Sequence, residues 1–445
     1  MNTAPATTRK DLVLGLGATG LSIARYLHRR AGDPLFFDTR KQPPGIDELH
    51  ALWPDAELLP GDAELPAGVD RIIASPGIAD SHPLLVKARQ QKIEIVSDIE
   101  LFAREARAPF AAVTGSNGKS TVTTLLYHMC RADGRNALAG GNLGEPALDL
   151  LEGPVPDIYV LELSSFQLQR TQTLPAAVAV LLNVSEDHLD WHSSAAEYRR
   201  SKYRIFREAR TAVINRADAE ARRQSALLDR VISFGSDAPE SGQYGLRIEN
   251  GAMYLARGGK LLFAASDLAM VGTHNQLNAL AALAAGELLG LSMPAMLQVI
   301  AEFPGLPHRM QFVARVDGVD YVNDSKATNV AAAVASINSI DGSLVLIAGG
   351  DGKGGDFRDL AAAVDGKLRA AVLIGADAEK IALALDTVMP VHFAADLRAA
   401  VRAAATYAET GDSVLLAPAC ASFDQFKNYG ERGDVFVEAV GALQP

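Results

Sequence analysis

The loop that ends in Lys119-Ser120 carries the residue types that phosphate chemistry needs. It follows a short apolar run, Phe110–Val113, which predicts a buried strand, and it opens a predicted helix. Free backbone N–H groups and the helix dipole attract phosphate, a lysine reaches the terminal phosphates, and a serine hydroxyl can hold Mg²⁺. The residues predicted to cradle the phosphates of a nucleotide are Gly115, Ser116, Asn117, Gly118, Lys119, Ser120 and Thr121. In the usual P-loop pattern, GxxxxGK[ST], the first glycine would fall at the position of Val113. The alternative to a phosphate site is an ordinary glycine turn beside a surface lysine. The strand before the loop and the helix after it favour the phosphate site.

Two side chains could supply metal ligands beside this loop. Glu162 ends an otherwise apolar strand, Ile158–Leu163, where a carboxylate without a partner would cost several kcal/mol. A metal ion or a water molecule held against the phosphates would relieve that cost. His188 follows the predicted strand Ala177–Leu182, at the edge of the sheet that carries the phosphate loop. From this position, His188 could equally be a metal ligand or a structural histidine.

Lys202 is a cation on an otherwise apolar face. In the predicted helix 197–206 it shares one stripe with Tyr198 and Ile205. The pattern alone favours a snorkelling lysine, whose ammonium group reaches water while its stem packs on apolar neighbours.

The N-terminal stretch predicts a second phosphate-binding turn. Gly15-x-Gly17-x-x-Gly20 follows the strand Leu12–Leu14, and Asp38 ends a second strand, placed for a ribose hydroxyl. This is a dinucleotide fingerprint, but the same turn serves any phosphate-bearing ligand, and Arg40 adds a cation for a further anionic group. A glycine-rich turn with a capping aspartate is the alternative.

Polar loops also follow three predicted strands near the C-terminus, at residues 323–329, 349–353 and 418–428. Because loops that follow parallel strands meet at one edge of a sheet, we expect them to cluster. Lys326 and Lys353, together with hydroxyl groups and helix N-termini, then predict an anion pocket.

The alternation of strands and helices predicts an α/β fold, and 445 residues suggest about three domains. We expect a Rossmann-like domain at 1–97, a central P-loop ATPase-like domain with a mostly parallel sheet at 98–303, and a Rossmann-like domain at 304–445. An antiparallel meander is expected at 247–265, where Asn-Gly and Gly-Gly turns separate short alternating runs.

The composition of the chain indicates which binding partners and which cellular compartment to expect. A net charge of −11 without a stripe of Lys and Arg argues against nucleic acid. Two cysteines, Cys130 and Cys420, exclude a disulfide framework and fit a reducing compartment. With no secretory pattern at the N-terminus and no apolar run of about 18 residues, we expect a cytoplasmic protein that does not insert into membranes.

The motifs together resemble the Mur ligase family from Leu14 to about Phe436. Those shared across the family are the phosphate loop TGSNGKSTVTTL and the EDH of LNVSEDHLD, while DTR, NDSKATN and DQFKN resemble the members that add D-glutamate. The other matching motifs are GLGATG, SPGI, DIELF, GGN, LELSSFQL, LPHR, GGDGK, PACAS and ERG. Phe423, Tyr429 and Gln311 differ from the usual Leu, Phe and Glu, and the first two leave the preferred glutamate enantiomer open.

The resemblance implies the substrates and a role for each matching residue. The acceptor, UDP-N-acetylmuramoyl-L-alanine, would contact Thr19, Asp38, Thr39, Arg40, Gly77, Asn142 and His188. ATP would contact the phosphate loop and Asn275, Asn278, Arg309 and Asp324. D-Glutamate would contact Lys326, Thr328, Lys353, Ser422, Phe423 and Tyr429. One Mg²⁺ would bind Ser120 and Glu162, and a second would bind His188 and Lys202, the latter carbamylated by CO₂.

The resemblance also implies a reaction through an acyl phosphate, with Lys119, His188 and Lys202 as catalytic residues, and we expect a monomer. Other ligases with this chemistry are the nearest alternatives: one that adds L-glutamate, another Mur ligase, or a folylpolyglutamate synthetase. The glycine turn at 15–20 also suggests an NAD-dependent oxidoreductase, which would leave the phosphate loop unexplained. A non-catalytic nucleotide-binding regulator would not need the metal ligands Glu162 and His188.

Overall fold

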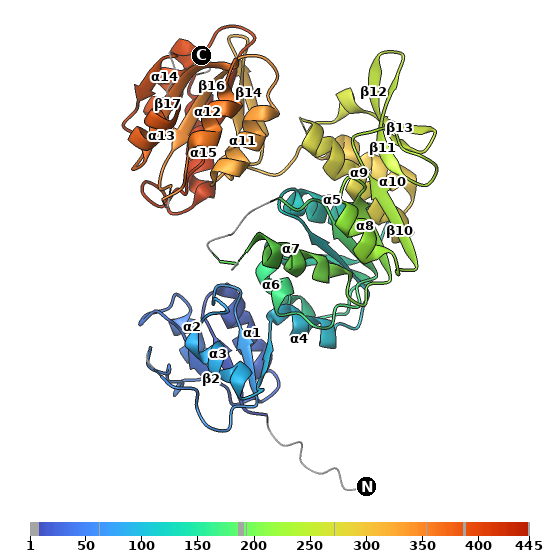
Figure 1. Cartoon of the computed structure of the whole chain (residues 1–445), viewed down its shortest axis with the longest axis vertical. Helices are drawn as coiled ribbons and strands as arrows, with labels where there is room; N and C mark the ends of the chain where they lie inside the picture. Colours follow the sequence, from blue (N-terminus) through green and yellow to red (C-terminus); the bar gives the residue numbers. More distant parts are fainter. Residues whose placement is uncertain are drawn as a thin grey trace. The chain divides into compact units, whose positions relative to one another are not determined.

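The computed structural model describes residues 9–61, 63–185, 191–192, 194–270, 272–352, 354–385 and 389–443. Its strands form three sheets that follow one another along the chain (Figure 1). Strands alternate with helices in all three parts, which confirms the predicted α/β fold class. Within the described residues, no helix is long and apolar enough to cross a membrane.

The first sheet is fully parallel, with strand order β2-β1-β3-β4. Its strands are β1 (Asp11–Leu14), β2 (Leu35–Phe37), β3 (Arg71–Ala74) and β4 (Glu94–Val96). The connecting helices are α1 (Ala18–His28), α2 (Ile46–Leu52) and α3 (Pro83–Gln90). A side chain on Gly20 would collide with the carbonyl oxygen of Gly15, so this glycine lets α1 pack close to the end of β1.

The second sheet has nine strands in the order β13-β12-β11-β10-β9-β8-β5-β7-β6. The parallel strands are β5 (Phe110–Thr114), β6 (Ala137–Gly141), β7 (Ile158–Glu162), β8 (Val178–Leu181), β9 (Thr211–Asn215) and β10 (Arg230–Phe234). Strand β11 (Tyr244–Glu249) pairs in parallel with β10, and β12 (Ala252–Arg257) and β13 (Lys260–Ala264) complete the predicted antiparallel meander. Because β5 lies between β7 and β8, the loops that follow these three strands are neighbours.

Helices of this second part connect and cover its strands. They are α4 (Asp98–Glu105), α5 (Lys119–Ala132), α6 (Ser165–Gln169), α7 (Ala195–Tyr203), α8 (Ala219–Ser225), α9 (Thr273–Leu288) and α10 (Met293–Glu302). Short 3₁₀ segments are η1 (Asp149–Leu151), η2 (Arg204–Phe206) and η3 (Ala265–Asp267).

The third sheet has the order β14-β15-β19-β16-β17-β18. Its strands are β14 (Gln311–Val316), β15 (Val319–Asn323), β16 (Leu344–Gly349), β17 (Leu368–Ile374), β18 (Val391–Phe393) and β19 (Ser413–Leu416). Its helices are α11 (Val330–Asn338), α12 (Arg358–Val364), α13 (Ala378–Leu385), α14 (Leu397–Tyr407) and α15 (Tyr429–Gly441). Strand β14, which the sequence analysis did not predict, is antiparallel to β15, and the other strands are parallel.

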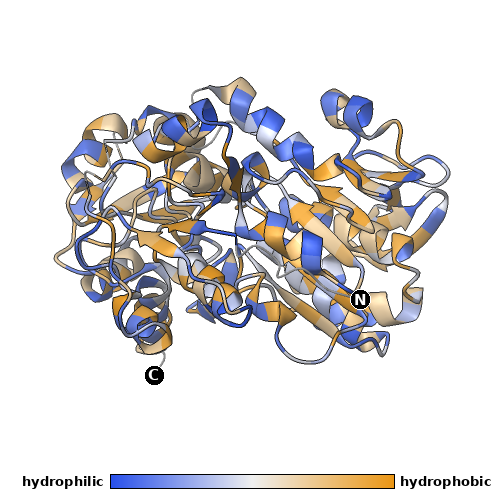
Figure 2. Ribbon diagram, turned by 90° about the horizontal axis from the view of Figure 1, so that it is seen from below, coloured by the Kyte–Doolittle hydropathy of each residue, from blue (hydrophilic) through white to orange (hydrophobic). Residues whose placement is uncertain are grey.

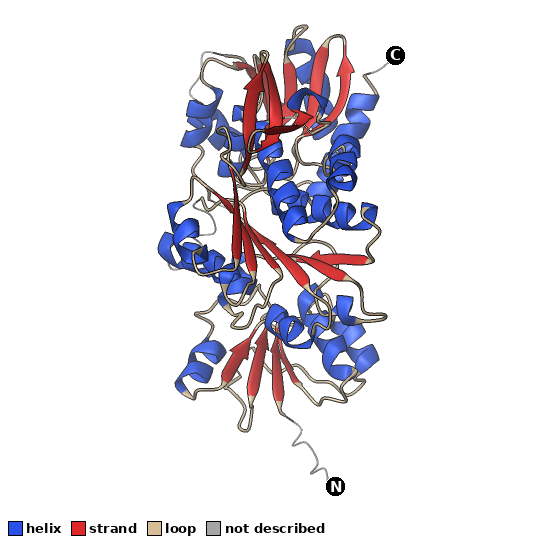
Figure 3. Ribbon diagram, turned by 90° about the vertical axis from the view of Figure 1, so that its right-hand side faces the viewer, coloured by secondary structure: helices blue, strands red, loops and turns tan. Residues whose placement is uncertain are grey.

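Alternate residues of the parallel strands pack into different cores. In β16, Leu346 and Ala348 join one apolar cluster while Val345 and Ile347 join another. Helices accordingly lie on both sides of the strands in Figure 3, and Figure 2 shows the strands as mostly hydrophobic. Coverage of both faces explains why these strands read as continuous apolar runs in the sequence.

The chain packs as two compact units. One contains the first two sheets, up to Ala264, and Leu277–Ile300, and the other contains Ala265–Gln276 and the chain from Ala301 onward. Helix α4 begins directly after Ser97, and the third sheet begins at Gln311. The boundaries at residues 97 and 303 nevertheless stay predictions.

Buried polar side chains join the start of α4 to α6 within the first unit. Asp98 is buried, and its Oδ2 accepts a hydrogen bond from Gln167 Nε2 at 3.1 Å. Its Oδ1 is buried and has no hydrogen-bond partner. Burial raises the pKa of Asp98 from 3.8 to about 6, and hydrogen bonds from Gln167 and the N–H of Ile99 offset this effect only in part. Glu100, also buried, accepts the N–H groups of Gln172 and Thr173 at 2.6 and 2.8 Å.

Asp98→Asn should change how stability depends on pH. The folded protein holds a proton on Asp98 up to a pH of about 6, whereas the unfolded chain loses it near 3.8, so wild-type stability falls as pH rises between these values. We expect the variant to gain up to about 3 kcal/mol relative to wild type between pH 3.5 and pH 7. Urea denaturation across this range measures the difference, and a difference that does not vary with pH would contradict the burial effect.

Candidate active site

The phosphate loop lies between β5 and α5, as predicted. Gly118 precedes the helix with a φ of +84°, a left-handed conformation that favours glycine. A side chain at this position would collide with Oδ1 of Asn278, which therefore lies against the loop. Ser120 and Thr121 are buried in the first turn of α5. The structure thus brings the predicted ATP residue Asn278 to the loop residues from a distant part of the sequence.

Asn183, which follows β8, holds the front of this loop. Its backbone oxygen accepts the N–H of Ser116 at 2.9 Å, and its Oδ1 accepts the N–H of Asn117 at 2.9 Å. The hydroxyl groups of Ser116 and Tyr198 lie 2.7 Å apart. Neither Asn183 nor Tyr198 was predicted as a site residue.

Two lysine ammonium groups meet at one carbonyl oxygen of the loop. Lys119 Nζ donates to the oxygen of Gly115 at 3.0 Å, and Lys202 Nζ donates to the same oxygen at 2.7 Å. Lys202 is only 2% exposed, and its ammonium group lies 4.9 Å from the centre of the Tyr198 ring. The snorkelling lysine favoured by the helical pattern alone is therefore wrong. Both side chains therefore end at the phosphate loop itself.

Glu162 lies beside the phosphate loop because β7 pairs with β5, with Glu162 opposite Val113. It is buried, and its Oε1 accepts a hydrogen bond from Asn142 Nδ2 at 2.6 Å. Its Oε2 is buried with no hydrogen-bond partner. An orphaned carboxylate oxygen next to a phosphate site fits a hard divalent cation, so Glu162 and Ser120 are suited to hold Mg²⁺.

The remaining predicted metal ligand, His188, lies outside the described residues. Among the residues that the structure does describe, no cluster of three His, Cys, Asp or Glu side chains could hold a metal ion by itself. The second metal site stays a prediction.

A cavity of about 440 Å³ lies at the end of the first sheet. Among its lining residues are six predicted for the UDP moiety: Thr19, Asp38, Thr39, Arg40, Gly77 and Asn142. Asn142 follows β6 of the second sheet, so the cavity draws on both sheets of the first unit. Gln167 and Ser75 also line it, and the sequence analysis did not single them out.

Asp38 is held by its own chain inside this cavity. Its carboxylate accepts the N–H of Leu16 at 2.7 Å and three N–H groups of Arg40 at 2.8, 2.8 and 2.9 Å. Burial raises the pKa of Asp38, but the hydrogen bonds from Arg40 and Leu16 outweigh it and lower the pKa to about 2. The carboxylate is therefore ionised at neutral pH, and it fixes Arg40 and the glycine turn in place.

The predicted glutamate pocket lies in the second unit, where β15, β19 and β16 are neighbours. Lys326 Nζ lies 4.0 Å from the centre of the Tyr429 ring, and Ser325 Oγ donates to the oxygen of Tyr429 at 2.8 Å. Ser422 is buried, while Phe423 is exposed. The loops that follow β15 and β19 are joined by a hydrogen bond of 2.9 Å from the N–H of Ala419 to the oxygen of Ala327. Thr328 lies in the same loop as Lys326, and Lys353 lies outside the described residues.

Arg432, in the ERG motif, is a buried residue beside these loops to which the sequence analysis gave no role. Its guanidinium group donates to the Oγ and the backbone oxygen of Ser325 at 3.0 and 2.8 Å, and to the oxygen of Cys420 at 3.1 Å. It thereby ties together the two loops that carry Lys326 and Ser422. Burial lowers its pKa to about 10, so it still carries a positive charge at neutral pH.

Three predicted nucleotide contacts belong to the second unit, whereas the phosphate loop belongs to the first. Asn275 is buried in the first turn of α9, and Arg309 precedes β14. Asp324 is buried, accepts hydrogen bonds from Ser336 Oγ and the N–H of Met310, and has a pKa raised by burial. Their role at the nucleotide stays a prediction.

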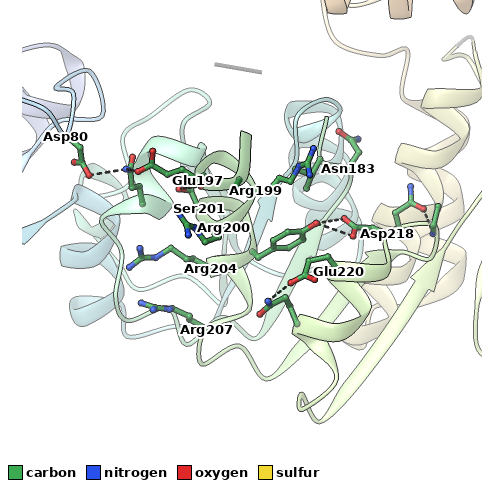
Figure 4. Close-up of a pocket in the computed structure, with 17 residues that line it drawn as sticks. Asp80, Asn183, Glu197, Arg199, Arg200, Ser201, Arg204, Arg207, Asp218 and Glu220 are labelled. Atoms are coloured by element: carbon green, nitrogen blue, oxygen red, sulfur yellow. Dashed lines mark hydrogen bonds between the residues drawn. The ribbon is translucent and has the colours of Figure 1, made fainter. Parts of the chain in front are cut away.

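A larger cavity, of about 1120 Å³, lies beside α7 and was not predicted. Its lining includes the arginines of α7, η2 and the residue after η2, at positions 199, 200, 204 and 207, and these are drawn with their acidic neighbours in Figure 4. Tyr203 in its wall donates to Asp218 at 3.1 Å. The sequence analysis had not assigned a role to any of these arginines.

Three family models match successive parts of the chain. The Mur ligase MurD-like N-terminal domain matches residues 9–97, the Mur ligase middle domain matches 113–286, and the Mur ligase glutamate ligase domain matches 308–420. The chain belongs to the Mur ligase family. The membership predicted from the motifs is thereby confirmed.

Relatives of this Mur ligase match it over nearly their whole length. It is 48% identical over 441 residues to the UDP-N-acetylmuramoylalanine–D-glutamate ligase of Legionella pneumophila (strain Paris), covering 97% of this chain and 99% of the relative. It is 49% identical over 441 residues to the protein of that name from Pseudomonas syringae pv. syringae (strain B728a), covering 98% of each. The crystal structure of MurF ligase from Thermotoga maritima in complex with ADP shares the fold, with a TM-score of 0.61, 19% identity, and coverage of 97% and 98%.

Proposed function

We propose that this Mur ligase uses ATP to join D-glutamate to UDP-N-acetylmuramoyl-L-alanine, a step in the synthesis of peptidoglycan precursors. The observation that carries the proposal is identity near 48% over almost the whole chain to relatives named for this reaction. The geometry supports it, since the phosphate loop, the orphaned oxygen of Glu162 and the 440 Å³ cavity all lie in one unit.

The reaction must bring two anions together. The carboxylate oxygen of the alanyl group attacks the γ-phosphorus of ATP, ADP leaves, and an acyl phosphate remains. The amine of glutamate then attacks the acyl carbon, and it loses a proton as inorganic phosphate departs. Lys119 turns from the carbonyl oxygen of Gly115 to the phosphates, where its charge offsets the charge that accumulates in the transition state. When bound, Mg²⁺ neutralises the phosphate oxygens and orients them for in-line attack.

Each substrate has a proposed place. The UDP moiety occupies the 440 Å³ cavity, between the glycine turn after β1 and the loop after β6. Glutamate occupies the pocket of Lys326, Thr328 and Ser422, where cationic and hydroxyl groups suit its carboxylates. We further propose two Mg²⁺ ions, a carbamylated Lys202, a monomer, and a place in the cytoplasm.

The test is an amino-acid specificity assay. ADP release is measured with ATP, Mg²⁺ and UDP-N-acetylmuramoyl-L-alanine, and with D-glutamate, L-glutamate or diaminopimelate in separate reactions. We expect release that depends on D-glutamate, with much lower rates for the other two. No D-glutamate-dependent release would refute the proposal, and faster release with L-glutamate or diaminopimelate would assign the chain to another specificity. An NADH titration without any binding would dismiss an oxidoreductase.

A further inference from the structure

Arg170, directly after α6, is a buried arginine whose guanidinium group binds a loop of the first sheet. It is 6% exposed. Its Nη1 donates to the backbone oxygen of Ser75 at 3.1 Å, its Nη2 donates to the backbone oxygen of Ile78, and its Nε donates to Asp80 Oδ1 at 3.0 Å. The three acceptors lie within six residues of one another, so one planar group holds the whole loop.

The loop that Arg170 holds forms part of the wall of the 440 Å³ cavity. Ser75, Pro76, Gly77 and Ile78 all line that cavity. Ser75 Oγ also donates to the oxygen of Gly15 at 3.0 Å, which joins the loop to the glycine turn after β1. A displacement of this loop would therefore change both walls that face the ligand.

Asp80 supplies the charge that balances Arg170. Its Oδ2 accepts a hydrogen bond from Gln169 Nε2 at 3.0 Å, and Arg89 forms an ion pair with it at 2.8 Å. A dashed line in Figure 4 marks this hydrogen bond between Asp80 and the last residue of α6. Burial lowers the pKa of Arg170 and the negative charge of Asp80 raises it. Burial of a charged guanidinium group is costly unless hydrogen-bond acceptors surround it. The loop must therefore keep the conformation that presents its carbonyl oxygens and Asp80 to Arg170.

The same segment also contributes directly to the cavity. Gln167, three residues before Arg170, lines the cavity. Hydrogen bonds at both its amide oxygen and its amide nitrogen fix the orientation of its side chain. Gln167 Oε1 accepts the N–H and the hydroxyl of Ser164 at 3.0 and 3.1 Å, and its Nε2 donates to Asp98. Residues 164–170 thus contribute Gln167 to the cavity lining and hold the loop 75–78 through Arg170.

We propose that Arg170 is a positioning residue for the UDP-bearing substrate. It sets the conformation of the loop 75–78 through its three hydrogen bonds, without contact to the ligand. This inference rests on the proposed function for the identity of the ligand. Arginine is required because lysine has no planar fork that could reach two carbonyl oxygens and a carboxylate together.

The test compares Arg170→Lys with a matched control, Arg89→Gln. Arg89 pairs with the same Asp80 but donates to the backbone oxygen of Asp80 and not to Ser75 or Ile78. For Arg170→Lys we expect the KM for UDP-N-acetylmuramoyl-L-alanine to rise about tenfold or more, with kcat and the KM values for ATP and D-glutamate within about twofold of wild type. Arg89→Gln should leave all four constants within about twofold. An unchanged KM for the UDP substrate, or a loss of kcat alone, would overturn the inference.

Calorimetric titration with UDP, in the absence of ATP, separates this inference from the proposed function. If wild type binds UDP but shows no D-glutamate-dependent turnover, the proposed function fails, and weaker UDP binding by Arg170→Lys still supports the positioning role. Equal binding by both proteins, or no binding by wild type, overturns it. If Arg170→Lys does not fold, Asp80→Asn replaces it, and we expect an increase of about threefold in the Kd for UDP. An unchanged Kd for Asp80→Asn overturns the inference.

Discussion

Replacing Lys119 by alanine should lower ADP formation by about 10²–10³-fold or more. The ammonium group lies at the mouth of the phosphate loop, hydrogen-bonded to the oxygens of Gly115 and Ser116 at 3.0 and 2.9 Å. In the proposed reaction, its charge offsets the charge that accumulates on the phosphates in the transition state between two anions. Loss of this charge affects the first chemical step, so formation of the acyl phosphate and complete turnover should fall together.

The control for Lys119→Ala is Lys260→Ala, in which an exposed lysine of β13 is removed. This variant should retain wild-type turnover, because it lowers the net charge of the protein equally without touching the loop. ADP release and trapping of the acyl phosphate with hydroxylamine measure the two steps. Near-normal turnover of Lys119→Ala would contradict its role at the phosphates.

Lys202→Ala should also lose about 10²–10³-fold in turnover, and a short carboxylate such as formate or acetate should restore much of it. The lysine is buried within 2.7 Å of the Gly115 oxygen, so its truncation leaves space beside the phosphate loop. If carbamylation converts the ammonium group to an anionic metal ligand, an added carboxylate can take that place. An uncarbamylated lysine would supply a positive charge, which a carboxylate does not replace.

The control for this rescue is Lys119→Ala in the same buffers. No carboxylate should restore its turnover, because the missing group there is a cation. Measuring turnover against carboxylate and Mg²⁺ concentration distinguishes a restored metal ligand from a general salt effect. Rescue of both variants alike would contradict the assignment, and no rescue of Lys202→Ala would count against carbamylation.

Most features that could be predicted from the sequence were recognised from short local motifs. The phosphate loop and the glycine turn at 15–20 depend on neighbouring residues and on a strand that leads into a helix, so their patterns are visible in a short window. Strand β14 was missed because it lies at the edge of its sheet and leaves much of its surface exposed, including Phe312. Its apolar alternation is correspondingly weak.

Long-range partners explain what could not be predicted. Arg170 contacts acceptors about 90 residues earlier in the chain, at Ser75, Ile78 and Asp80, and nothing in its own neighbourhood indicates them. Lys202 has the helical stripe of a snorkelling lysine, yet its ammonium group ends at a loop 87 residues away. A sequence pattern identifies which face of a helix is apolar. It does not identify what that face meets.

The cavity shared by the first two sheets has a consequence for inhibitor discovery. Gly77 and Arg40 line it from the first sheet, and Asn142 and Gln167 line it from the second. A fragment that ends at residue 97 would keep the glycine turn but lose Asn142, Gln167 and the guanidinium group of Arg170, which holds the loop 75–78. Compounds selected against such a fragment would be matched to a shallower and differently shaped surface. Screening for compounds that bind this cavity therefore requires a protein that contains both sheets of the first unit.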